Sequence, residues 1–94
     1  MSEFTLSKPF VFEEKEYTTL NLNMEDLTGA DLENIEREMS AAGMIVSLPE
    51  ASKSYQMYVA ARSAKVPVAL IKALPLRDAS AITMKVQSFL LGMA

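Results

Sequence analysis

The chain of 94 residues contains no cysteine, no histidine and no tryptophan. Without cysteine it can form no disulfide, no thiol nucleophile and no cysteine-ligated metal site. Without histidine it lacks the commonest metal ligand and the side chain that most often serves as a general base near neutral pH. The two absences argue against an enzyme or a metal-binding protein.

Long apolar runs are also missing, since no stretch approaches the roughly 18 apolar residues that a membrane-spanning helix needs. Residues 1–4, Met-Ser-Glu-Phe, have neither the positive start nor the apolar stretch of a signal peptide. We therefore expect a cytoplasmic protein that does not contact a membrane. Glycine is scarce, and the three glycines form no phosphate-binding loop.

Charge is distributed unevenly along the chain. Residues 1–47 hold ten acids and three bases, a net charge of −7, whereas residues 48–94 hold two acids and six bases, a net charge of +4. The two halves either pack against each other or one of them meets a partner, or a second copy, of opposite charge. We favour packing, because long-range charge complementarity mostly steers encounters.

A β-hairpin is predicted for residues 4–22. Phe10 and Phe12 alternate with Val11, and the leucines at 20 and 22 alternate with polar residues, with the period of two that is typical of a strand. The acidic run at residues 13–16 is expected to form a solvated turn between them. Pro9 is placed near the start of the first strand, where a missing N–H is tolerated.

The first predicted helix covers residues 28–42. Thr28 and Asp31 have the spacing of a capping box, with Asp in place of the more usual Glu. Gly43 is expected to end the helix in a left-handed conformation. Three apolar residues recur at helical spacing and mark the expected buried side, namely Leu32, Ile35 and Met39.

The second half of the chain is predicted to hold further helices. Ser47, as an N-cap followed by proline and glutamate, predicts a helix that runs to about residue 65. Pro67 ends this helix, and a short third helix precedes Pro75. A last helix is expected at residues 76–91, with one buried side formed by Leu76, Ala79, Ile82, Val86, Phe89 and Leu90.

These elements predict an α+β fold, with an N-terminal β-hairpin followed by a small array of three to four helices. We expect one domain over residues 1–94, with the hairpin in residues 4–22 and the helical part in residues 28–91. A chain of this length has no room for a second core.

Residues 57–74 resemble a helix-turn-helix in outline, and they lie in the basic half of the chain. However, Pro67 opens the presumed recognition helix, and the usual glycine of the turn is absent. Lys72 is the only charged residue of that helix, which has no Arg, Asn or Gln to read a base edge. A small helix-turn-helix-like DNA-binding regulator is therefore the alternative function, although we expect no nucleic-acid partner.

The seven methionines are typical of a surface that repacks around a partner. On the last helix, Met84 and Leu91 lie off the expected core side, so they are the first candidates for partner binding. Burial of a second side of this helix is the open alternative. Tyr58 and Ala61 on the alanine-rich second helix are the next candidates. No residue is a candidate for catalysis or for binding a cofactor or metal.

Several short strings occur in a distinctive order along the chain. They are Glu16-Tyr17-Thr18-Thr19-Leu20, Leu27-Thr28-Gly29-Ala30-Asp31-Leu32, Pro49-Glu50-Ala51-Ser52-Lys53-Ser54-Tyr55, Val59-Ala60-Ala61-Arg62, Val66-Pro67-Val68, Leu74-Pro75 and Val86-Gln87-Ser88-Phe89-Leu90-Leu91. This series closely resembles the Mu-like family of phage tail assembly proteins, which are tail assembly chaperones. The resemblance spans nearly all of the chain, although no single string is a catalytic signature.

The resemblance implies a non-enzymatic role without a cofactor. Chaperones of the family that the chain resembles cover the long, helical tape measure protein until tail tube subunits polymerise around it. They are absent from the mature virion. A frameshifted longer product often adds a domain that recruits the tail tube protein. This chain ends at Gly92-Met93-Ala94 and is expected to be the short product. The expected partners are the tape measure protein, possible further copies of the chain and, through the longer product, the tube protein, all in the host cytoplasm.

Overall fold

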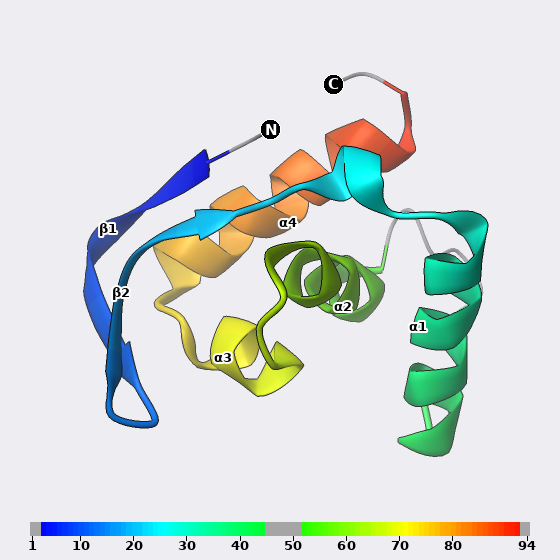
Figure 1. Cartoon of the computed structure of the whole chain (residues 1–94), viewed down its shortest axis with the longest axis horizontal. Coiled ribbons are helices and arrows are strands. Elements are labelled where there is room, and N and C mark those ends of the chain that lie inside the picture. The colour runs from blue at the N-terminus through cyan, green and yellow to red at the C-terminus, as the bar shows by residue number, and fades with distance from the viewer. Residues whose placement is uncertain (1–2, 45–51, 93–94) are drawn as a thin grey trace.

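The computed structural model describes residues 3–44 and 52–92. An antiparallel hairpin is followed by four α-helices, so the predicted α+β class is confirmed (Figure 1). The elements in chain order are β1 (Glu3–Phe12), β2 (Lys15–Asn21), the short 3-10 helix η1 (Met24–Asp26), α1 (Gly29–Ala41), α2 (Lys53–Ala64), α3 (Val68–Ala73) and α4 (Leu76–Leu90).

The hairpin turns at Glu13 and Glu14, whose φ angles are 51° and 67°. Positive φ at both central residues is the geometry of the type I′ turn, whose twist matches that of the two strands. The strand register shifts within residues 5–10, and Pro9 lies inside this irregular stretch. The predicted place of Pro9 near the strand start is therefore wrong, because β1 already begins at Glu3. An irregular register tolerates proline, which has no N–H to donate.

The start and end of α1 confirm the sequence prediction. The Thr28 hydroxyl accepts a hydrogen bond from the Asp31 N–H, and the Asp31 carboxylate accepts one from the Thr28 N–H at 2.9 Å. Beyond the last turn, Gly43 has a φ of 82°, as a left-handed helix end requires. Of the three residues expected on the buried side, Ile35 and Met39 are buried and Leu32 is half-buried.

The start of α2 differs from the prediction. The Ser52 hydroxyl accepts a hydrogen bond from the Tyr55 N–H at 3.2 Å, and this N-cap starts the helix at Lys53. The predicted N-cap, Ser47, lies outside the described residues. Ser52 also has the chemistry of an N-cap, but the prediction rested on the proline and glutamate that follow Ser47 and so missed it.

In Figure 1, α2 lies near the centre of the fold, where it contacts α1, α3, α4, η1 and β2. It ends at Lys65, which has a left-handed φ of 59°, and the next N–H, from Val66, donates to the Ala61 carbonyl at 3.0 Å. As predicted, a short helix separates Pro67 from Pro75. The fully buried apolar side chains come from both halves of the chain and include Leu22, Ile35, Val59, Leu70, Ile71, Ile82 and Val86.

One side of α4 is buried, as predicted, except at the first residue of the helix. Ile82 and Val86 are fully buried, and three residues are half-buried against the core, namely Ala79, Phe89 and Leu90. Leu76 is 82% exposed, so its assignment to the core is wrong. At about 100° per residue, Leu76 lies about 120° around the helix from Ile82, and it faces outward.

Hydrogen bonds to a buried carboxylate join the hairpin to α4. Asp78, in the first turn of α4, is 3% exposed and accepts two hydrogen bonds from Ser7 of β1. The Ser7 N–H donates to Oδ1 at 3.0 Å, and the Ser7 hydroxyl donates to Oδ2 at 2.9 Å. Ser7 lies in the part of β1 where the strand register shifts. The two hydrogen bonds therefore hold this irregular part of the strand against α4.

Candidate functional site

The four partner-binding candidates lie on two separate surfaces. Tyr58 and Ala61 line a pocket on α2, which we call the α2 groove. Met84 and Leu91 project outward from the C-terminal helix and are 61% and 50% exposed. Together with the exposed Leu76, they form a surface that we call the α4 ridge. Sequence reasoning missed Leu76 because it assigned this residue to the core.

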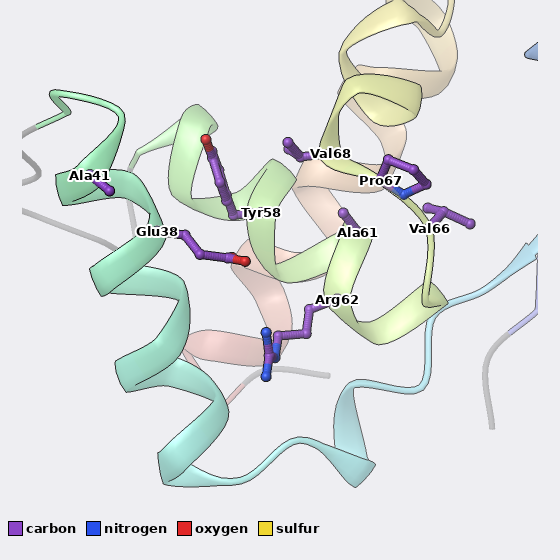
Figure 2. A pocket seen from close by; sticks show the side chains of 8 residues that line it. All are labelled: Glu38, Ala41, Tyr58, Ala61, Arg62, Val66, Pro67 and Val68. Atoms are coloured by element: carbon purple, nitrogen blue, oxygen red, sulfur yellow. The ribbon is translucent and has the colours of Figure 1, made fainter. Parts of the chain in front are cut away.

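The α2 groove has a volume of about 460 Å³ (Figure 2). Its floor is formed by α2, one wall by α1, and the other by the segment that joins α2 to α3. The lining residues are Glu38, Ala41, Tyr58, Ala61, Arg62, Val66, Pro67 and Val68. Ala61, on the floor, is only 4% exposed, so the groove presents to a partner chiefly the half-buried side chains of Tyr58, Val66 and Val68.

A salt bridge joins the floor of the groove to its α1 wall. The Nε atom of Arg62 lies 2.9 Å from Oδ1 of Asp31, the residue that also caps α1. The pKa of Asp31 is lowered from its usual value, first by the hydrogen bond from the Thr28 N–H and then by the hydrogen bond from Arg62. One ionised carboxylate therefore both caps α1 and holds it beside α2.

The two oppositely charged halves of the chain are joined by a salt bridge. Within residues 3–44 and 52–92, the pair of Arg62 and Asp31 is the one salt bridge between the halves. Acidic side chains of the hairpin and of α1 are instead exposed, namely Glu13, Glu14, Glu16, Glu33, Glu36 and Glu38.

The geometry of α3 bears on the helix-turn-helix alternative. This helix has six residues, and Leu70 and Ile71 are buried. Its charged residue, Lys72, places Nζ 5.6 Å from the centre of the Tyr58 ring, at a distance where a cation and an aromatic ring attract each other. The side chains of α3 are thus directed to the core and to Tyr58, which leaves this helix little with which to read DNA.

Both surfaces combine apolar side chains with exposed charged groups, a composition that suits contact with another protein. Among the described residues, no His, Cys, Asp or Glu cluster of three or more could hold a metal ion. The helices in the same part of the chain are too short or too polar to cross a membrane.

The chain was compared with known proteins. A family described as phage tail assembly chaperone proteins, E, or 41 or 14, matches residues 3–91. The search of curated proteins and the search of solved structures each found no match. The family match includes the hairpin, all four α-helices and both candidate surfaces. Assembly chaperones are not enzymes, in agreement with the expectation from the sequence. The chain belongs to the phage tail assembly chaperone family.

Proposed function

We propose that this chain binds the tape measure protein and keeps it soluble until the tail tube assembles around it. The observation that carries the proposal is the family match over residues 3–91, which extends across both candidate binding surfaces. Binding is assigned to the helical half, at Tyr58 and Ala61 in the α2 groove and at Met84 and Leu91 on the α4 ridge.

The two surfaces suit a long helical client. An amphipathic helix can lay its apolar side into the α2 groove against Tyr58, Val66 and Val68, above the small buried side chain of Ala61. On the ridge, the flexible Met84 side chain adapts to different apolar partners. Many copies of a small domain along one client raise the effective concentration of binding sites without tight binding at each of them.

The proposal places this activity in the host cytoplasm, before the mature virion forms. It also includes the tail tube protein, which a frameshifted longer product would recruit. The nucleotide sequence of the gene tests this part of the proposal. A slippery heptamer near its 3′ end, followed by an open −1 frame and a tape measure gene, is the expected result.

Co-expression with a fragment of the cognate tape measure protein tests the main proposal. The fragment should be recovered in the soluble fraction with the wild-type chain and should aggregate without it. Two variants, Met84→Gln/Leu91→Gln on the ridge and Tyr58→Ala at the half-buried position in the groove, should lower this recovery while circular dichroism shows a folded chain. Val11→Gln is the matched control, because Val11 is 64% exposed on the hairpin, away from both surfaces. Equal aggregation of the fragment with and without the wild-type chain would refute the proposal.

A further inference from the structure

The α4 ridge has an apolar centre with a basic border. The exposed large apolar side chains of the described residues are Val11 on the hairpin and the three that form the ridge. At about 100° per residue, Leu76, Leu91 and Met84 lie within an arc of about 80° on the helix surface, and the uncharged polar residues Ser80 and Gln87 lie between them in the same arc. Arg77 and Lys85 lie beyond Met84 on the same helix, and both are exposed.

The opposite edge of the ridge is also basic, because α2 contributes a lysine there. Thr83 lies about 20° outside the apolar arc, on the side away from Arg77. The exposed Lys53 reaches this edge from the start of α2, and its Nζ donates a hydrogen bond to the Thr83 hydroxyl at 3.2 Å. Positive charges therefore border the apolar centre on both sides.

The described part of the helical half, residues 52–92, exposes no acidic side chain, and the acid nearest to the C-terminal end of α4 is Glu25 of η1, which lines a small pocket with Phe89 and Leu90. Across the described residues 52–92, the single acid is Asp78, which is 3% exposed and accepts two hydrogen bonds from Ser7. It therefore offers no accessible carboxylate to balance Lys53, Arg77 and Lys85. The α2 groove differs, since its α1 wall carries the exposed carboxylate of Glu38.

We propose that the α4 ridge docks an amphipathic helix whose apolar stripe is bordered on both sides by Asp and Glu. The 15 residues of α4 present a straight surface about 22 Å long, which matches a helical partner of similar length. The inference rests on the proposed function and deepens it, because it defines the chemistry of the client segment that contacts Met84 and Leu91.

Three stapled helical peptides of about 15 residues provide the test, since they span α4 and stay helical when free. All carry the same Leu stripe, and their borders consist of Glu, Gln or Lys. Fluorescence anisotropy should show that the Glu peptide binds most tightly and the Lys peptide least. Raising the salt from about 0.1 M to about 1 M, which shortens the Debye length to about 3 Å, should remove most of the difference.

Variants of the full chain assign the two contributions to residues. Met84→Gln/Leu91→Gln should weaken binding of the Glu peptide roughly tenfold or more. Arg77→Gln/Lys85→Gln should remove much of the difference in affinity between the Glu and Gln peptides, and adding Lys53→Gln should remove most of the remainder. Lys15→Gln/Arg37→Gln removes the same charge from exposed positions of the hairpin and of α1 and should leave both affinities unchanged.

Several results would overturn the inference. The Gln peptide binding as tightly as the Glu peptide at low salt would remove the electrostatic part, and binding that survives Met84→Gln/Leu91→Gln would move the site elsewhere. Displacement of the Glu peptide by a DNA or RNA oligonucleotide would assign the ridge to nucleic acid. Self-association that the ridge variant abolishes in sedimentation experiments would assign the ridge to a second copy. If any of these occurred while the tape measure fragment stayed soluble, the inference would fail and the proposed function would stand.

Discussion

Asp31 and Arg62 lie 31 residues apart in the chain, and their side chains meet at 2.9 Å between Oδ1 and Nε. We predict that Asp31→Asn lowers the free energy of unfolding at pH 7. The amide oxygen can still accept the hydrogen bond from Thr28, so the variant removes the charge while keeping most of the cap. Urea unfolding of wild type and variant at pH 7 measures the effect.

The same variant makes a prediction about pH. Thr28 and Arg62 lower the pKa of Asp31 in the folded chain, so its stabilising effect is present above the unfolded-state pKa, about 3.9. That effect is lost as the pH falls from about 3.9 through the lowered folded value. The difference between wild type and Asp31→Asn should therefore shrink below about pH 4. Glu33→Gln, at an exposed position of α1, is the control, and a difference that did not shrink as the pH fell below about 4 would contradict the assignment.

The bond between Ser7 and Asp78 leads to a second prediction. Ser7→Ala leaves one oxygen of a buried carboxylate without its hydroxyl donor, which should lower the free energy of unfolding by about 1–3 kcal/mol. Ser40→Ala, at an exposed position of α1, should change it by less than about 0.5 kcal/mol. A double-mutant cycle with Asp78→Ala separates the pairwise interaction from other effects, and a coupling near zero would refute it.

Local patterns in the sequence predict local structure in this protein. The capping box of Thr28 and Asp31, the end of α1 at Gly43 and the helix breaks at Pro67 and Pro75 are confirmed, because each depends on the chemistry of a few neighbouring residues. The start of α2 is not predicted, because Ser52 competes with an equally suitable serine upstream.

Contacts between distant residues are not predictable from such patterns. Asp78 and Ser7 are 71 residues apart, and nothing near either residue indicates that the carboxylate is buried. In the same way, the spacing of Tyr58 and Ala61 places both on one side of α2, but the walls of the groove come from α1 and from residues 66–68. Helical periodicity also assigns Leu76 to the core, although the chain has no element packed over that side of α4 in the described residues.

A third prediction compares two apolar residues of α4. Ile82→Ala should lower the free energy of unfolding by about 2–5 kcal/mol, because it opens a cavity at a fully buried position. Leu76→Ala should change it by less than about 0.5 kcal/mol, since this side chain is 82% exposed. Denaturant unfolding of both variants tests the outward orientation of the ridge. A large effect of Leu76→Ala would mean that the residue is covered in solution.

The geometry of α3 predicts that the chain does not bind specific duplex DNA at physiological salt. Leu70 and Ile71 are buried and Lys72 lies over Tyr58, so few groups are available to contact a base edge. The measurement is a titration of labelled duplexes at several salt concentrations, because non-specific contacts weaken steeply as salt rises. A footprint that survives at physiological salt would restore the helix-turn-helix alternative.

The hairpin turn provides the last prediction. Glu13 and Glu14 both have positive φ, a conformation that costs an ordinary L-residue roughly 1–2 kcal/mol. Asn-Gly is the pair that type I′ turns prefer, so replacing Glu13-Glu14 by Asn-Gly should relieve much of this cost. Glycine also makes the unfolded chain more flexible, which offsets part of the gain. The expected net increase in the free energy of unfolding is about 0.5–1 kcal/mol, and each kcal/mol raises the melting temperature of a chain of this size by about 4–8 °C. Thermal unfolding of the variant is compared with that of Glu13→Gln/Glu14→Gln, which removes the same two charges but keeps both side chains. If the Gln variant gained as much stability, charge repulsion in the acidic turn would be responsible, and the backbone explanation would be wrong.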